Sequence, residues 1–500
     1  MKKSLCVLLM LAMVLSMAAC APAPQEQTTA PTQETTTAPT EGLKELPKVF
    51  MAGYCKMDIT PAEYGVPMQG YDNDDARLSN GLYTYLYATT LAVRDEAGSQ
   101  ALIISVDSGS IQEEICTDIR EAIKEETGIP VENILITAIH QHSTPAFYSA
   151  KYKERADEYR NFMKERIVQS AKDALEDLAP AELYIATIET EGLTFVKHYL
   201  MADGSYAGDL YGSFSKEIVG HESEADNDLQ LVKIDRAGQT TVDGKEAKSI
   251  LLSNFQGHPH TGTSSSDPNL SADVPGIYRE AVEAETGYHV MYISGAQGNL
   301  NMSSRIVEEN NYGSFKERGE ALAKYAINAK DEDFTKVNTG KVQGAVVTYE
   351  GKTDHSMDDL VPEATKIDAV WASTFNSSEA MKLATSGRVH SVYHATAIIA
   401  KAKEGPTKPM PVIAISFGDI AICGGMYEMF DTNGMEIKEG SPFAMTFTAH
   451  MANGAYGYIP SAMSYEHGCY PADITRFAKG TGEELRDAML QMLNTQRQAQ

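Results

Sequence analysis

The chain has 500 residues and is strongly acidic, with 69 acidic against 42 basic side chains and a formal net charge of −27 at pH 7. This excess of negative charge repels both the phosphate backbone of nucleic acids and anionic lipid surfaces, so neither is an expected electrostatic partner. A chain of this length is ample for one large folded domain or for two.

The first residues have the composition of an export signal. Two lysines precede an apolar run over residues 5–17, and Ala18-Ala19-Cys20 follows. This arrangement resembles the lipobox of bacterial lipoproteins, in which the cysteine is lipidated and becomes the first mature residue; a plain secretory signal is the alternative. We therefore expect a signal peptide over residues 1–19. We also expect a lipid on Cys20 that anchors the protein to the extracytoplasmic face of the cell membrane.

A segment of low complexity follows over residues 20–44. It consists mainly of Ala, Pro, Gln, Glu and Thr, and the sequence of residues 28–32 recurs at residues 36–40. Such a segment cannot bury enough apolar surface to offset its loss of chain entropy. We expect an extended tether here, so that residues 45–500 form the folded domain.

The rest of the chain alternates between short apolar runs and amphipathic stretches. The apolar runs predict strands at residues 91–93, 101–106, 134–136, 249–252, 290–293, 342–349, 392–400, 412–415 and 419–422. Helical periodicity predicts helices at residues 113–126, 159–178, 313–329 and 482–493. This alternation indicates a layered α/β architecture with mixed sheets. The four cysteines beyond Cys20 form no CxxC pair, and we interpret them as isolated, mostly buried thiols.

Two histidine pairs are the most informative motifs. The sequence has only 12 histidines, yet His140-Gln141-His142 follows one predicted strand and His258-Pro259-His260 lies shortly after another. Imidazole is the commonest protein ligand for zinc, and strand ends hold ligands rigidly. The two pairs favour a metal site. The alternative is that each pair caps a strand and satisfies loop backbone groups.

Short motifs occur in a distinctive order along residues 50–490. They are Ala52-Gly53, Asp58-Ile59-Thr60-Pro61, Gly70-Tyr71, Arg77, Leu82-Tyr83, residues 140–143, Asn254-Phe255, His258-Pro259, residues 271–276, Asn453, Tyr456, Gly457-Tyr458 and Tyr470. Together they resemble the N-terminal catalytic domain of neutral/alkaline (non-lysosomal) ceramidases, zinc amidohydrolases that cleave ceramide into sphingosine and fatty acid. The resemblance implies that family's layered mixed-sheet α/β fold. The chain ends where we expect the catalytic domain to close, without the family's C-terminal immunoglobulin-like domain.

The resemblance also implies a zinc ion bound by two histidines, a glutamate and a tyrosine. By position, these ligands are His140, His258, Glu428 and Tyr458. Zinc in such a site polarises a water molecule for attack on an amide carbonyl. His142 is then the proton shuttle or oxyanion donor, and Tyr470 is a second hydrogen-bond donor. We interpret His260, which often has no counterpart in the family, as a residue outside the ligand set or at the surface.

Several departures from the family pattern bear on the substrate. Leu300 stands near the position of the family's serine, and Met426-Tyr427 precede Glu428 where the family usually has Pro-Gly. Lys197 or His198 takes the place of the family's active-site arginine, although lysine lacks the bidentate fork of a guanidinium.

The sequence therefore predicts a zinc-dependent hydrolase of an amide bond in a ceramide-like or other N-acylated substrate at the cell surface. A catalytically inactive binding lipoprotein of the same fold is the alternative that the departures favour. A zinc esterase or phosphoesterase that uses the same site is a third interpretation.

Overall fold

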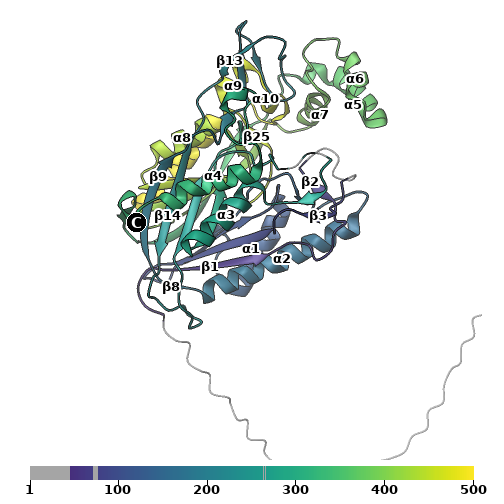
Figure 1. Ribbon diagram of the computed structural model, residues 1–500. Helices are drawn as coiled ribbons and strands as arrows, with labels where there is room; N and C mark the ends of the chain where they lie inside the picture. Colours follow the sequence, from purple (N-terminus) through teal and green to yellow (C-terminus); the bar gives the residue numbers. More distant parts are fainter. Residues whose placement is uncertain (1–45, 71–76, 263, 265) are drawn as a thin grey trace, which may run out of the picture. The chain divides into compact units, whose positions relative to one another are not determined.

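Three sheets of four or five strands form the framework of the folded unit, residues 47–500 (Figure 1). The computed structural model describes residues 46–70, 77–262, 264 and 266–500, so the predicted signal peptide and tether lie outside the described residues. Among the described helices, none combines the length and the apolar character that a membrane span requires.

The first sheet has the strand order β6-β5-β4-β1-β8. Its strands are β1 (Met51–Asp58), β4 (Tyr87–Arg94), β5 (Gln100–Val106), β6 (Ile134–Ala138) and β8 (Ala179–Pro180). β6 pairs with β5 in parallel, while the other pairs are antiparallel. α2 (Lys153–Glu176), which follows α1 (Glu113–Thr127), packs against β1 and β4. The approach is so close that a Cβ on Gly53 would lie 2.1 Å from the Ala174 carbonyl oxygen, which explains the glycine in the Ala52-Gly53 motif.

The second sheet has the order β17-β15-β14-β9-β19. Its strands are β9 (Glu182–Glu189), β14 (Asp228–Asp235), β15 (Ile250–Phe255), β17 (His289–Ser294) and β19 (Thr335–Val337). β15 and β17 are parallel, and α3 (Asp273–Thr286) connects them. α3 packs against α4 (Phe315–Asn328), which begins with a capping box formed by Ser314 and Glu317.

The third sheet has the order β20-β21-β22-β24. Its strands are β20 (Val342–Lys352), β21 (Thr407–Phe417), β22 (Ile420–Gly425) and β24 (Met445–Ala449), and β22 and β24 are parallel. Helices α8 (Asp431–Gly440) and α11 (Thr481–Gln498) pack together and contact this sheet. Apolar faces of all three sheets meet in one core, to which the sheets contribute, for example, Ile103, Leu252 and Ile415.

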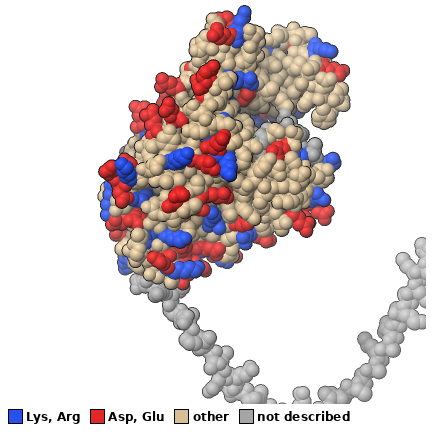
Figure 2. Space-filling model, viewed as in Figure 1, with Lys and Arg blue, Asp and Glu red and all other residues tan. Residues whose placement is uncertain are grey.

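Short strands and helices order the connecting loops. The strands are β2 (Met68–Gln69), β3 (Gly81–Leu82), β7 (Thr144–Pro145), β10 (Phe195–Val196), β11 (Tyr199–Met201), β12 (Tyr206–Ala207), β13 (Ile218–His221), β16 (Asn269–Leu270), β18 (Leu300–Asn301), β23 (Glu428–Met429) and β25 (Tyr458–Ile459). The helices are α9 (Ala462–His467) and α10 (Tyr470–Ile474). On the face shown in Figure 2, Lys and Arg lie among Asp and Glu rather than in one patch.

A helical segment between β20 and β21 corrects one prediction. It contains α5 (Val361–Thr374), α6 (Ser377–Ala380) and α7 (Val392–Lys401). The predicted strand at residues 392–400 is wrong, because these residues form α7. Their apolar residues Val392, Ala395 and Ile398 are spaced by three, and all three are buried in the small core of this segment. The remaining predicted strands and helices correspond to observed elements, and the four described cysteines are free thiols as predicted.

A buried ion pair fixes α3 to the first sheet. Arg279 donates to both oxygens of Asp107, at 3.0 and 2.5 Å, and both side chains are 1% exposed. Because a single substitution leaves the other charge buried and unpaired, we expect Arg279→Met to lower the free energy of unfolding by about 3–5 kcal/mol in denaturant titrations. Arg388→Met, at an exposed pair with Asp359, serves as the control and should cost less than about 1 kcal/mol. Equal effects at the two sites would contradict the prediction.

A second pair links α10 to the segment before α7 and makes stability depend on pH. Nδ1 of His390 lies 2.8 Å from Asp473 Oδ2, and this hydrogen bond raises the pKa of His390. Because the pKa of His390 is higher in the folded state, its protonation stabilises the folded protein below the unfolded pKa of about 6.5. This stabilisation is lost as pH rises through the folded pKa. The melting temperature of His390→Gln should therefore lie below that of wild type by about 1–2 °C near pH 6, and the gap should close toward pH 8.5. A gap that widens with pH would contradict this assignment.

Candidate metal centre

His140 stands directly beyond β6 in an unusual backbone conformation. Its φ is 66°, in the left-handed region that non-glycine residues rarely adopt, and its backbone N–H donates to the Ser108 carbonyl at 2.9 Å. Nδ1 lies 2.5 Å from the Gly109 carbonyl oxygen and must therefore donate to it. This contact leaves Nε2 as the acceptor nitrogen, and Nε2 faces Glu428.

The loop that carries His142 is held by two residues of the predicted motifs. A Cβ on Gly70, which has a φ of 111°, would lie 2.4 Å from the His142 Cα, so only glycine fits there. Arg77 donates from Nη2 to the carbonyls of His142 and Gln69, at 2.9 and 2.5 Å. The His142 ring is thereby held with its centroid 5.2 Å from that of His140.

His258 and His260 lie beyond β15. His258 is buried and forms a parallel bridge with Asn301, and its ring centroid is 4.5 Å from that of His140. His260 is half-buried, with its ring centroid 5.3 Å from that of His142, so it adjoins the cluster. Asp273, from the residue 271–276 motif, accepts hydrogen bonds from Gly262 N and Thr261 Oγ1 and fixes the loop that follows.

Glu428 and Tyr458 come together because their two-residue strands pair. β23 and β25 are parallel neighbours in which Glu428 stands opposite Tyr458. Burial, together with the negative charge of Glu428, raises the pKa of Tyr458 well above its usual value. Gly298 packs directly behind Glu428, where a Cβ would lie 2.5 Å from the Glu428 carbonyl oxygen. Two predicted ligands that are 30 residues apart in the sequence are thus adjacent.

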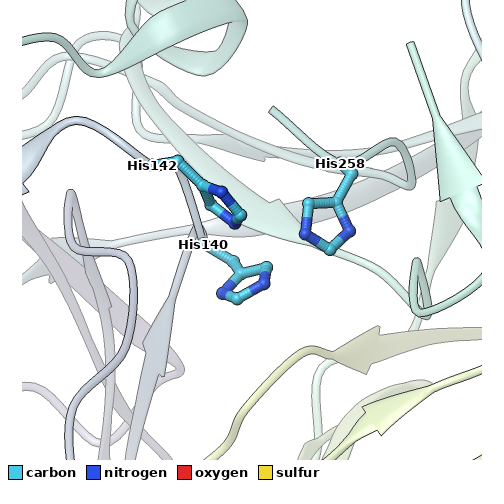
Figure 3. A group of neighbouring side chains, drawn as sticks. All are labelled: His140, His142 and His258. Carbon is cyan, nitrogen blue, oxygen red and sulfur yellow. The ribbon is translucent and has the colours of Figure 1, made fainter. Parts of the chain in front are cut away.

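In this cluster the potential ligand atoms form two groups that share His140; a third group in the described residues consists of His390, His394 and Asp473. His140, His142 and His258 make up the first group (Figure 3), and His140, Glu428 and His450 make up the second. Within each group all the ligand atoms lie within 4.8 Å of one another. The two predicted ligands His258 and Glu428 therefore belong to different groups, each of which includes His140.

The residues present fit a zinc ion. His140 Nε2 and Glu428 Oε2 are 3.2 Å apart, yet Glu428 Oε2 is buried and makes no hydrogen bond to any described residue. Two atoms that both bind one tetrahedral zinc at its usual bond lengths are separated by about 3.3 Å. The nitrogen and oxygen donors, the distance and the unsatisfied oxygen all suit such an ion.

Burial sets the charge states in the cluster. It holds the pKa values of His142 and His258 well below their usual range, with a further contribution from charge on His140. It lowers the pKa of His260 to about 4. Burial is the largest influence on Glu428 and opposes its ionisation, but the combined effect of His140, His450 and Lys197 leaves the Glu428 pKa lowered. Neutral imidazoles next to a carboxylate are the forms that bind metal ions near neutral pH.

Other predicted residues lie at different distances from the cluster. The ring centroid of Tyr470 is 6.3 Å from that of Tyr458. Lys197 is buried with its Nζ 5.4 Å from the centroid of the Tyr458 ring, whereas His198 pairs with Glu222 and so contacts a different group. Leu300 is fully buried in β18 and brings no hydroxyl group to the site.

His450 is the site residue that sequence reasoning missed. It follows β24, and its ring centroid is 5.0 Å from that of His140. The family motifs do not include it. The signal that identified the two histidine pairs, an imidazole directly after an apolar strand, also applies to His450.

The protein has a layered α/β fold in which histidine, carboxylate and phenol groups gather at strand ends. These features define its class, a layered α/β protein with a candidate metal centre. Residues 50–196 match the family model described as neutral/alkaline non-lysosomal ceramidase, N-terminal. The predicted resemblance to the neutral/alkaline ceramidase family is therefore confirmed.

Solved structures support the same fold. Neutral ceramidase from Pseudomonas aeruginosa aligns with a TM-score of 0.66 at 16% identity, covering 91% of this chain and 75% of that chain. A structure titled as ceramidase complexed with C2 aligns with a TM-score of 0.66 at 15% identity, covering 91% and 76%. No curated protein sequence matches significantly. The predicted fold class is thus confirmed, while these identities are too low to transfer an activity.

Proposed function

We propose that this protein is a zinc-dependent hydrolase of an amide bond in a ceramide-like or other N-acylated substrate. The observation that carries the proposal is the buried cluster of histidine, carboxylate and phenol groups, placed at strand ends of a fold shared with neutral ceramidase. Perturbed titratable groups that converge in this way are typical of catalytic sites.

The ligands that we propose for zinc are His140, His258, Glu428 and Tyr458. When bound, zinc supplies Lewis acidity that activates a water molecule and polarises a carbonyl group. The chain fixes these side chains rigidly, because His140 is held through Gly109 and Glu428 is paired with Tyr458 across β23 and β25.

Three further residues act on the substrate in this proposal. His142, neutral near pH 7, takes a proton on a ring nitrogen during attack and returns it to the departing amine. Tyr470 donates a hydrogen bond from its hydroxyl to the carbonyl oxygen as negative charge develops there. Lys197 contributes a buried positive charge close to the Tyr458 ring.

A binding lipoprotein without catalytic activity is the second candidate, and Leu300 is the observation that favours it. Characterised ceramidases carry a serine near this position, whereas Leu300 is fully buried here. Tyr427, which stands where the family has glycine, packs into the core with Met426. A zinc esterase that uses the same cluster is a third candidate.

Turnover of a substrate panel distinguishes these candidates. Purified protein with one zinc per chain would be incubated with N-acylsphingosines, N-acyl amino acids and matched esters, and the released amine or alcohol would be quantified by mass spectrometry. We expect amide cleavage that stops after chelation and returns with zinc. Binding of N-acyl compounds without turnover of any amide or ester would favour the binding lipoprotein, and turnover of esters alone would favour the esterase.

We also propose a lipid anchor on Cys20. A single acyl chain gives only marginal membrane binding, and the acidic domain does not attract anionic lipids. Membrane partitioning should therefore depend mainly on the lipid anchor. Cys20→Ser is expected to shift most of the protein from the membrane fraction to the soluble fraction, as measured by immunoblotting. Cys55→Ser, at a described thiol, is the control. Equal membrane partitioning of Cys20→Ser and wild type would count against lipidation.

A further inference from the structure

His450 is a buried imidazole that has no hydrogen-bond partner among the described residues. Its side chain is 2% exposed, and neither ring nitrogen bonds to any residue that the structure describes. An imidazole removed from water without a partner costs free energy, so such a group in a folded protein requires an explanation. The nearest groups able to provide one are the candidate metal ligands.

The backbone around His450 is fixed to the strands that carry the site. Its N–H donates to the Ser294 carbonyl at 2.9 Å, and its carbonyl accepts from Thr137 Oγ1 at 2.5 Å. The backbone N–H of Asn453, whose φ is 61°, donates to the Ile136 carbonyl at 2.7 Å, and the Ile136 N–H donates to Asn453 Oδ1 at 2.9 Å. Because Thr137 and Ile136 belong to β6, the position of His450 is fixed relative to His140.

Three donor groups converge on one point between these strands. His140 offers only Nε2, because its Nδ1 donates to Gly109. Glu428 Oε2 lies 3.2 Å from that nitrogen and is itself without a hydrogen bond among the described residues. A ring nitrogen of His450 lies within 4.8 Å of one potential ligand atom of each of these two residues. Glu428 Oε2 and a ring nitrogen of His450, which both lack a hydrogen bond among the described residues, would gain the same partner from one cation.

We propose that His450 is a ligand of the metal ion that His140 and Glu428 hold. This inference rests on the proposed function, since it assumes an ion in this cluster. It adds a nitrogen donor to the candidate ligands and places the ion toward the Glu428 side of His140. Catalytic zinc sites typically have three protein ligands and keep a fourth position for water, so His450 competes with His258, which belongs to the other group, for a place in the shell.

Metal binding by the full chain tests the proposal. Zinc content would be measured by mass spectrometry, affinity by competition with a chelator, and coordination by the visible absorption of the cobalt-loaded protein. His450→Gln should weaken binding at least about 10-fold and change the cobalt spectrum. His289→Gln, at a half-buried histidine that stacks on Tyr54, is the matched control and should leave both unchanged.

Stability of the metal-free protein separates a ligand from a packing residue. In metal-free protein His450→Leu should melt no lower than wild type, because it removes an unsatisfied buried polar group. A packing role instead predicts a lower melting temperature with and without metal. Unchanged affinity and cobalt spectrum in His450→Gln would overturn this inference alone. A wild-type protein that binds no metal would overturn the proposed function together with it.

Discussion

Replacing His140 with alanine is expected to abolish stoichiometric metal binding, with the largest loss of affinity of any single histidine substitution in the cluster. His140 is the only described residue common to both groups of potential ligands, and its ring is oriented by the Gly109 carbonyl. The remaining residues are divided between the two groups, and neither set completes a shell without His140. We expect affinity to fall at least about 100-fold, since loss of an outer contact already costs 10–100-fold.

Zinc per chain, measured after dialysis against a weak chelator, checks this expectation. His258→Ala should also lose affinity, but to a smaller extent if the ion lies toward Glu428. His355→Ala, at a partly exposed histidine outside the cluster, serves as the control for nonspecific effects. Full zinc content in both His140→Ala and His258→Ala would show that the metal site has been placed wrongly.

The sequence predicted the parts of this fold that local patterns determine. β6 and β15 are apolar runs bounded by turn residues, and each leads to a histidine pair, so both the strands and the histidines could be located. α7 was misread because its apolar run was taken for a strand, although Val392, Ala395 and Ile398 recur every third residue, as on one face of a helix. The Ser391 cap was the available sign of a helix, since its side chain accepts from His394 N.

The site itself depended on contacts that no local pattern contains. Glu428 and Tyr458 meet through two-residue strands, which are too short to produce a periodic signal. His140 and His450 follow β6 and β24, strands of different sheets that both contact β17 of the second sheet. No other histidine lies near His450 in the sequence, so no histidine-pair motif marked it, although it follows a buried strand as His140 does.

For His142 the structure is compatible with two roles that exclude each other, metal ligand and catalytic group. It belongs to the group with His140 and His258, but its loop is held separately, by Gly70 beneath it and by Arg77. If the ion lies on the Glu428 side of His140, the His142 ring borders the metal site without binding the ion. A neutral imidazole in that position is suited to transfer protons.

We therefore expect His142→Ala to keep its zinc and its melting temperature while turnover of the amide substrate falls about 10²–10⁴-fold, the usual range for loss of a general acid–base group. Zinc content, melting temperature and kcat would be measured on one preparation, with His260→Ala as the neighbouring control. Loss of zinc in His142→Ala would make His142 a ligand and reverse its role with His450. If wild type turns over no amide or ester but binds N-acyl ligands as tightly as the variant does, the cluster serves binding alone. Only a proton-transfer role for His142 predicts normal zinc content together with low kcat, because a ligand role removes the metal and a binding role leaves no turnover to lose.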